Sequence, residues 1–340
     1  MRCLVMEDFG RMAVAEAADP KVTAGHVVID VVATGICGSD LHGYTGENGR
    51  RKPGQVMGHE SVGRIRALGD GVEGIEVGAT VTFNPLVVPA AERPLYRGRE
   101  QHAPGRSVIG VNPSVRAAFA EQVVVPAENV VPLPDSVPIT WGALVEPLAV
   151  AVNVVRRVAV TAEDTVLVIG GGPIGQSCVL AAQHAGATSV YVSEPSTSRR
   201  ALCEQLGAVP LQPGEPVEEQ VRALNGGPVT VAIDAVGITA TIQDALRATV
   251  AGGRVGLVGM GAPVTELQTY EVSTLERTIT GSFCYSDEVF RAAAAWVADG
   301  STDFSALISE EVPLAEGPDA FARLAAGADI PGKVLVRLDR

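Results

Sequence analysis

The sequence predicts a two-domain α/β protein, in which a small, irregular β-barrel domain accompanies a doubly wound domain built on a parallel sheet. Its 340 residues exceed what one ordinary hydrophobic core accommodates. The first part of the chain consists of short apolar runs separated by glycines, as in a small barrel. From about Ala143 onward, helix-like segments alternate with apolar runs, which is typical of strands that pair in parallel.

Short strands are expected in the first part, where apolar and β-branched residues follow one another. They cover residues 3–6, 27–33, 61–67, 80–84, 108–111 and 119–125. Glycines at 69, 71, 74 and 78 supply turns, and prolines at 132, 134 and 138 mark the transition to the second domain.

In the second part, the predicted strands are residues 166–169, 190–192, 229–234, 254–258 and 278–283. Helical segments such as 176–184, 216–224 and 240–250 lie between them. Residues 287–299 form an amphipathic helix with Phe290, Ala294 and Val297 on one stripe, and residues 333–338 form a final strand. We therefore expect one domain of residues 1–148 and 285–340, and another of residues 149–284.

A glycine-rich stretch follows the strand 166–169 at once. Gly170, Gly172 and Gly175 have the spacing G-x-G-x-x-G, with Pro173 and Ile174 inside it, and Glu194 ends the next apolar run. One glycine permits a tight turn, one lets a pyrophosphate approach the backbone, and one lets helix and strand pack closely. The alternative is an ordinary glycine-rich turn with a surface glutamate. The complete order of strand, glycines, helix, strand and acid favours a dinucleotide site.

Glu194 favours NAD over NADP as the dinucleotide. Its carboxylate can accept hydrogen bonds from both hydroxyls of the adenosine ribose, and it would repel a 2′-phosphate. Arg199 and Arg200 could bind such a phosphate, but they also fit solvated positions in the first turns of the next helix. We prefer the second interpretation, and we keep Arg199 among the residues expected to contact the cofactor.

Composition excludes several classes of partner. Hydrophobic residues make up 46% and charged residues 19% of the chain, the profile of a soluble globular protein. The formal net charge of −13 argues against nucleic acid or an anionic membrane surface. No apolar stretch looks long enough to span a bilayer, and no signal peptide is evident. The five cysteines are odd in number and scattered, which predicts no disulfide framework and a reducing cytoplasm.

Four dispersed residues could hold a metal ion. Cys37 lies in the segment ICGSDLH, His59 and Glu60 in GHE, and Glu146 in VEPLAVA. Thiolate, imidazole and carboxylate are zinc ligands, and a site with an open position would be catalytic. The alternative is that Cys37 is a small buried hydrophobic residue and that His59 and Glu60 are a surface pair.

These motifs together resemble the zinc-dependent medium-chain dehydrogenases, and in particular the polyol branch of sorbitol (L-iditol), L-idonate and L-threonine dehydrogenases. The resemblance covers essentially the whole chain and includes the segments VGLVGMG and GSFCYSDEVFRAAAAWVADG. It implies a GroES-like catalytic domain and a Rossmann domain. It also implies homodimers or homotetramers that pair their nucleotide-domain sheets edge to edge, with residues 278–283 at the seam.

The resemblance also implies roles for individual residues. Cys37, His59 and Glu60 would bind zinc, and Glu146 would bind it directly or through water. Ser39 and His42 would relay the substrate proton to solvent, with Glu60 beside them, whereas Asp40 would be structural. Further cofactor contacts would come from Val236, Val258, Gly259, Met260, Ser282 and Phe283.

The sequence departs from the family in ways that bear on metal content and substrate. Residues 84–106 lack the four cysteines that hold a second, structural zinc in many relatives, so we expect one zinc. Cys284 replaces an arginine of sorbitol dehydrogenases, and Gly43 replaces a tyrosine, which leaves sorbitol itself in doubt. Basic residues concentrated in the catalytic half suggest a substrate with an acid group, such as a sugar acid; a solvated loop or an oligomer contact is the alternative explanation for Arg50, Arg51, Lys52, Arg93, Arg97, Arg99 and Arg106.

The function expected from the sequence is the NAD-dependent interconversion of a secondary alcohol and its ketone. The substrate would be a small molecule, namely a polyol, a sugar acid or a related hydroxy compound. Two alternatives remain at this point. One is a zinc-free quinone or enone reductase on the same fold, and the other is a nucleotide-binding protein without catalytic activity.

Overall fold

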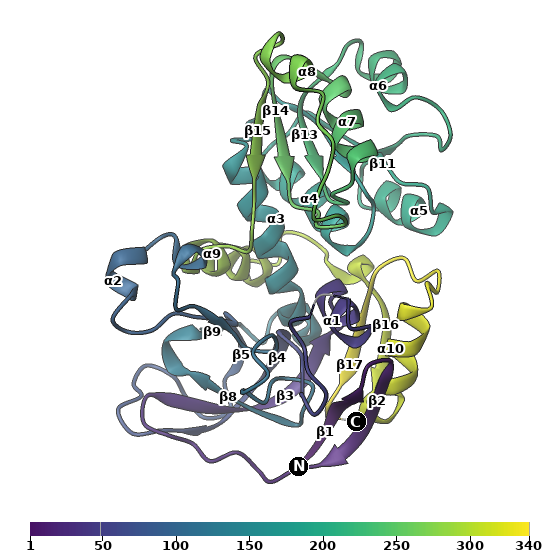
Figure 1. Ribbon diagram of the computed structural model, residues 1–340. Helices are drawn as coiled ribbons and strands as arrows, with labels where there is room; N and C mark the ends of the chain where they lie inside the picture. The colour runs from purple at the N-terminus through teal and green to yellow at the C-terminus, as the bar shows by residue number, and fades with distance from the viewer. Residues whose placement is uncertain (48, 340) are drawn as a thin grey trace. The chain divides into compact units, whose positions relative to one another are not determined.

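The computed structural model describes residues 1–47 and 49–339, which form two compact units (Figure 1). The first unit comprises Met1–Glu146, Tyr285–Ala328 and Lys333–Arg340, and the second comprises Pro147–Cys284 and Asp329–Gly332. Compared with the predicted boundaries, residues 147–148 and 329–332 move to the second unit. Asn48, in the segment 47–52 that holds three of the basic residues noted above, and Arg340, the last residue of the first predicted domain, lie outside the described residues.

The first unit is built mainly from strands. These are β1 (Arg2–Asp8), β2 (Arg11–Glu16), β3 (His26–Gly35), β4 (Glu60–Leu68), β5 (Thr80–Phe83), β6 (Leu86–Val87), β7 (Ser107–Val108), β8 (Gln122–Pro126), β9 (Val130–Pro132), β16 (Ile308–Pro313) and β17 (Lys333–Arg337). Its helices are α1 (Gly38–Tyr44), α2 (Arg93–Tyr96), α9 (Asp287–Ala298) and α10 (Gly317–Ala325). Strand β1 contains the predicted strand 3–6, whereas β2, β16 and α10 have no counterpart among the predicted elements.

Strand β3 is the central strand of the first unit. The main sheet has the order β16-β17-β3-β4-β5-β9, and β8 also pairs with β3. Seven of the ten residues of β3 are buried, because β17, β4 and β8 all pair with this strand. Two of the predicted strands are shorter than expected, since β7 ends at Val108 and β8 begins at Gln122.

The second unit is a doubly wound sheet, as the sequence predicts. Its parallel strands are β10 (Thr165–Ile169), β11 (Ser189–Ser193), β12 (Val209–Pro210), β13 (Val229–Asp234), β14 (Thr249–Leu257) and β15 (Thr278–Gly281). Its helices are α3 (Val145–Arg157), α4 (Pro173–His184), α5 (Thr197–Gln205), α6 (Val217–Asn225), α7 (Thr239–Ala248) and α8 (Thr269–Ser273). The first two residues of α3 belong to the first unit, because the second unit begins at Pro147. The strand order β12-β11-β10-β13-β14-β15 reverses direction at β10, which is the arrangement of dinucleotide-binding sheets.

The apolar strands of the second unit are buried on both faces. Successive side chains of a strand point to opposite faces. Leu167 and Ile169 of β10 belong to a core cluster that includes Val221 of α6 and Leu246 of α7. Val166 and Val168, which alternate with them, are also fully buried. Burial of both faces explains why these strands lack an alternating apolar and polar pattern.

One helical run is longer and more apolar than the sequence analysis allowed. The run Ile139–Arg157 has 19 residues and contains an 18-residue window with a mean hydropathy of 1.3, so length and composition alone would let it cross a membrane. The expectation that no such stretch exists was therefore wrong. In the structure, however, 72% of its apolar window is buried inside the protein, as in an ordinary core helix.

Asp164 joins three segments at the amino end of the second sheet. Its carboxylate accepts hydrogen bonds from the backbone of Thr161 at 2.7 Å and from the hydroxyl of Thr230 at 2.7 Å, and it pairs with Arg254. Burial opposes ionisation of Asp164, but these hydrogen bonds and the Arg254 charge outweigh it and hold its pKa below the ordinary value. The ionised form therefore stabilises the fold.

Replacing this carboxylate tests its contribution. Asp164→Asn should lower the free energy of unfolding at pH 7 by about 2 kcal/mol, measured by urea denaturation. Because the folded pKa is lowered, the wild-type advantage should be complete above the ordinary pKa of Asp and should disappear as pH falls through the folded pKa. Glu163→Gln, which changes an exposed neighbour, should have little effect. An undiminished difference at acidic pH would contradict this account.

Candidate active site

The register of three strands brings distant residues together in the first unit. Gly35 at the end of β3 pairs with Glu60 of β4 on one side and with Leu335 of β17 on the other. Cys37 follows Gly35 by two residues, and Lys333 precedes Leu335 by two. A Cβ atom on Gly35 would lie 2.4 Å from the Glu60 carboxylate, so a glycine is required for this side chain to lie against β3.

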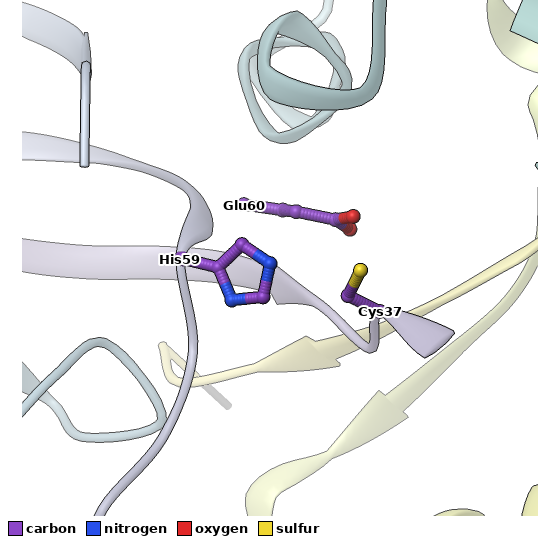
Figure 2. A group of neighbouring side chains, drawn as sticks. All are labelled: Cys37, His59 and Glu60. Atoms are coloured by element: carbon purple, nitrogen blue, oxygen red, sulfur yellow. The ribbon is translucent and has the colours of Figure 1, made fainter. Parts of the chain in front are cut away.

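Cys37, His59 and Glu60 form a group that could hold a metal ion. One ligand atom from each lies within 4.8 Å of the others. Figure 2 shows the thiol, one ring nitrogen and the carboxylate directed toward a common space. His59 and Glu60 are buried and Cys37 is half-buried. Three ligands of this chemistry fit tetrahedral zinc with one position open.

Lys333 contacts the carboxylate of Glu60. The sequence analysis placed this lysine in a strand and gave it no role. Its Nζ lies 2.5 Å from both oxygens of Glu60 and 3.5 Å from the Ile36 carbonyl oxygen. Burial lowers the pKa of Lys333, but Glu60 and Cys37 outweigh it and raise the pKa, so the ammonium is retained. The Glu60 carboxylate thus has a fixed, buried counter-ion.

Asp40 orients the other side of the group. It is fully buried, accepts a hydrogen bond from Arg51 at 3.2 Å, and lies 3.5 Å from Nδ1 of His59. That ring nitrogen is buried and has no hydrogen-bond partner within the part of the chain that the structure describes. A carboxylate behind a histidine is the usual means of fixing the ring of a metal ligand. Burial opposes protonation of His59, but Asp40 and Cys37 outweigh it and raise its pKa well above the ordinary value.

Glu146 does not belong to the group of three. Its Oε1 accepts a hydrogen bond from the hydroxyl of Tyr285 at 2.9 Å. Burial raises the pKa of Glu146 and the neighbouring Glu60 adds to the increase, whereas His59 opposes it. Of the four predicted ligands, the structure therefore gathers three, and the fourth is held by Tyr285, which the sequence analysis did not identify.

Ser39 and His42 lie on helix α1, three residues apart and hence on one face. Ser39 is half-buried and His42 is exposed. Nδ1 of His42 lies 2.8 Å from the carboxylate of Glu47. This contact leaves the other ring nitrogen of His42 for a further partner.

The predicted glycines form the tight loop between β10 and α4 in the second unit. Gly170 has a φ of +94°, which disfavours other residues. A Cβ atom on Gly175 would lie 1.7 Å from the Gly170 carbonyl oxygen. On Gly172, by contrast, it would point into open space. Helix α4 begins at Pro173, directly after this glycine and earlier than the sequence predicts, and Ile174 follows in its first turn. Bare backbone at a helix start fits a pyrophosphate.

Glu194 is locked against this loop. It is buried, and its two carboxylate oxygens accept hydrogen bonds from the backbone of Gly171 and of Ser196, each at 2.7 Å. A carboxylate has about four acceptor positions, so two remain for ribose hydroxyls. Arg199 and Arg200 lie in the first turn of α5 as predicted, and Arg200 donates hydrogen bonds to the carbonyl oxygens of Glu194 and Pro195.

The remaining predicted cofactor residues follow the other strands of the same sheet. Val236 follows β13, Val258, Gly259 and Met260 follow β14, and Ser282 and Phe283 follow β15. Ligands of such sheets bind outside the carboxyl ends of the strands. A Cβ atom on Gly259 would lie 2.3 Å from the Val236 backbone, so these loops pack tightly together. Ser282 accepts a hydrogen bond from Asn153 at 3.0 Å.

The structure weakens the sequence-based argument for an acid-binding site. Arg51 is 2% exposed and is committed to Asp40. Arg93 forms an ion pair with Glu128. These two cations are therefore engaged within the protein rather than presented to a substrate.

Two family models match the chain. The description of one is alcohol dehydrogenase GroES-like domain, and it matches residues 23–135. The description of the other is zinc-binding dehydrogenase, and it matches residues 173–299.

Similar proteins include dehydrogenases of several alcohols. L-threonine 3-dehydrogenase of Pyrococcus abyssi (strain GE5 / Orsay) is 38% identical over 247 residues, which are 71% of this chain and 70% of the relative. Sorbitol dehydrogenase of Ovis aries is 30% identical over 344 residues, which are 99% and 96% of the two chains. A structure from Sinorhizobium meliloti 1021, described as a zinc-binding dehydrogenase bound to NADP, is 30% identical, has a TM-score of 0.90 and covers 99% of this chain and 98% of its own.

Alanine substitutions at two glycines of this loop should affect different properties, namely stability for Gly175 and NAD binding for Gly172. Gly175→Ala should lower the free energy of unfolding by about 3 kcal/mol or more, because its methyl group meets backbone. Gly172→Ala should change it by less than about 0.5 kcal/mol, since its methyl group meets nothing. It should nevertheless weaken NAD binding about tenfold or more by blocking the phosphate approach. Urea denaturation and calorimetric titration measure the two effects. Unimpaired NAD binding by Gly172→Ala would contradict this assignment.

Proposed function

Because the chain belongs to the zinc-type medium-chain dehydrogenases of the polyol branch, we propose that it oxidises a secondary alcohol to a ketone with zinc and NAD. The substrate class is a polyol, a sugar acid or a related hydroxy compound. The observation that carries this proposal is the convergence of Cys37, His59 and Glu60, whose ligand atoms all lie within 4.8 Å of one another. The first unit is the catalytic domain and the second is the nucleotide-binding domain.

Cys37, His59 and Glu60 would hold the metal, and Glu146 would act on it through water. When bound, zinc supplies a Lewis acid that lowers the pKa of a substrate hydroxyl. Lys333 pairs with the Glu60 carboxylate and holds it in place, and Asp40 lies against the His59 ring. The carboxylate of Glu60 pairs with Lys333, and that of Asp40 pairs with Arg51. These buried pairs fix Glu60 and the His59 ring in position before a metal binds.

Ser39 and His42 move the substrate proton to solvent. Half-buried Ser39 accepts the substrate proton as its own hydroxyl proton moves on toward His42, and exposed His42 releases a proton to solvent. The hydrogen bond from Nδ1 of His42 to Glu47 directs the other ring nitrogen to this task. An imidazole ring suits this step because one ring nitrogen can accept a proton while the other donates one.

The dinucleotide is NAD rather than NADP. The carboxylate of Glu194 is fixed by two backbone hydrogen bonds and cannot turn away from a 2′-phosphate without breaking them. Its free acceptor positions suit the two ribose hydroxyls of NAD instead. Arg199, Val236, Val258, Gly259, Met260, Ser282 and Phe283 supply further contacts along the same sheet edge.

A single zinc ion per chain is enough for this fold. Segment 84–106, which contains no cysteine, is closed by hydrogen bonds from the Gly105 backbone to Glu92 at 2.9 Å and from Arg93 to the Val88 carbonyl oxygen at 2.9 Å. These contacts take the place of a structural metal. None of the five cysteines forms a disulfide, which suits a reducing cytoplasm.

The second sheet supplies the oligomer contact. Strand β15 is the last strand of that sheet, and its outer edge has unpaired backbone groups among the described residues. Val264 and Tyr270, in the segment before it, are more than 80% exposed. Such an edge with apolar neighbours suits pairing with a second copy, giving a homodimer or homotetramer.

Metal content and activity test the function together. The purified protein should contain about one zinc per chain by mass spectrometry of the metal, and it should reduce NAD with a polyol or aldonate panel. A chelator should abolish this activity. Cys37→Ser should lose the zinc, whereas Cys3→Ser, a buried thiol elsewhere in the first unit, should retain it.

Three outcomes would overturn parts of the proposal. Chelator-resistant activity would indicate a zinc-free quinone or enone reductase. Nucleotide binding without turnover of any substrate would indicate a binding protein. Two tightly bound zinc ions per chain would contradict the single site.

A further inference from the structure

A short segment from near the chain's end completes the nucleotide-binding unit. Residues 329–332 belong to the second unit, although the chain on both sides belongs to the first. The Asp329 carboxylate accepts hydrogen bonds from the hydroxyls of Ser196 at 3.0 Å and Ser198 at 2.5 Å. The Pro331 carbonyl oxygen accepts one from Gln176 at 2.6 Å. The segment is thus attached both to the start of α5 and to helix α4.

These attachments lead directly to Glu194. Ser196 donates its backbone N–H to Glu194, and Gly171 donates to the other oxygen of the same carboxylate. The Gly171 carbonyl oxygen accepts a hydrogen bond from Gln176, which also reaches Pro331. Ser196 therefore connects Asp329 with Glu194, the residue proposed to bind the adenosine ribose, because it donates a hydrogen bond to each.

The start of α5 would otherwise attract a phosphate. Two serine hydroxyls and two arginines, in the order Ser196, Ser198, Arg199 and Arg200, follow Glu194 at a helix N-terminus. Hydroxyls, guanidinium groups and free N–H groups are the donors that phosphates prefer. In this structure both hydroxyls donate to Asp329 instead, and Arg200 is used by carbonyl oxygens.

We propose that Asp329 is a second specificity-determining residue, which excludes the 2′-phosphate of NADP. It occupies the hydroxyl donors that this phosphate would need, and it adds a negative charge beside that of Glu194. Like charges brought together at a binding site weaken binding. The ribose hydroxyls of NAD are neutral and use Glu194, so they are unaffected. This inference rests on the proposed function, since it concerns the same nucleotide site.

Two probes that differ by one phosphate isolate the effect. 5′-AMP has a free ribose 2′-hydroxyl, and 2′,5′-ADP has a phosphate there. We would measure Kd for both by calorimetric titration of the full-length protein, without any substrate. In the wild-type protein we expect 2′,5′-ADP to bind at least about tenfold more weakly than 5′-AMP.

Asp329→Ala should lower the ratio of the two Kd values about tenfold, chiefly by tightening 2′,5′-ADP. Asp329→Asn keeps a hydrogen-bond acceptor but removes the charge, so it should lower the Kd ratio by less than the alanine substitution does. This variant replaces Asp329→Ala in the test if the alanine variant is unstable. Glu204→Gln removes an exposed carboxylate from the same helix and should leave the ratio unchanged.

The outcomes separate this inference from the proposed function. An unchanged ratio in both Asp329 variants, with normal 5′-AMP binding, would overturn the role of Asp329 and leave the dehydrogenase proposal intact. Equal weakening of both nucleotides would show that Asp329 only anchors its segment. A wild-type protein that binds neither nucleotide would overturn both proposals.

Discussion

The buried contact between Glu60 and Lys333 is the interaction on which the metal-binding half depends. Both side chains are at most 5% exposed, and the ammonium lies 2.5 Å from each carboxylate oxygen. Removing one partner of a buried pair typically costs about 3–5 kcal/mol, because the other charge is left without compensation. Such a pair tolerates no slip of β17 or β4 against β3. A register error of one residue would turn one of the two charges to the other face of the sheet.

The nucleotide-binding half is organised by backbone rather than by charge pairs. Glu194 is held by the N–H groups of Gly171 and Ser196, and the loop is closed by glycines with no room for a methyl group. Gln176 ties that loop to the segment 329–332. Hydrogen bonds of this kind fix geometry without adding charge, so the loop remains able to accept the negative charge of a pyrophosphate.

The sequence was informative where local chemistry decides the structure. The glycine spacing, the buried strands and Glu194 predicted the doubly wound unit, because each of these features depends on neighbours in the sequence. It was less informative in the first unit, where short strands pair across long separations and β16 and α10 were missed. Lys333, Tyr285 and Asp329 were missed for a related reason. A lysine at the start of an apolar strand gives no local sign that its partner is 273 residues away.

One short stretch near the chain's end supplies a polar contact within each of the two units. Asp329 binds the serines at the start of α5 in the second unit, and Lys333, four residues later, binds Glu60 in the first. The two side chains have opposite charges, and neither residue type indicates a function by itself. The role of each depends on the residues that it contacts in the folded protein. A carboxylate that accepts hydrogen bonds from nearby hydroxyls repels a phosphate, whereas an ammonium paired with a carboxylate holds a potential metal ligand in place. The same few residues can therefore influence nucleotide choice and metal binding through independent electrostatic effects.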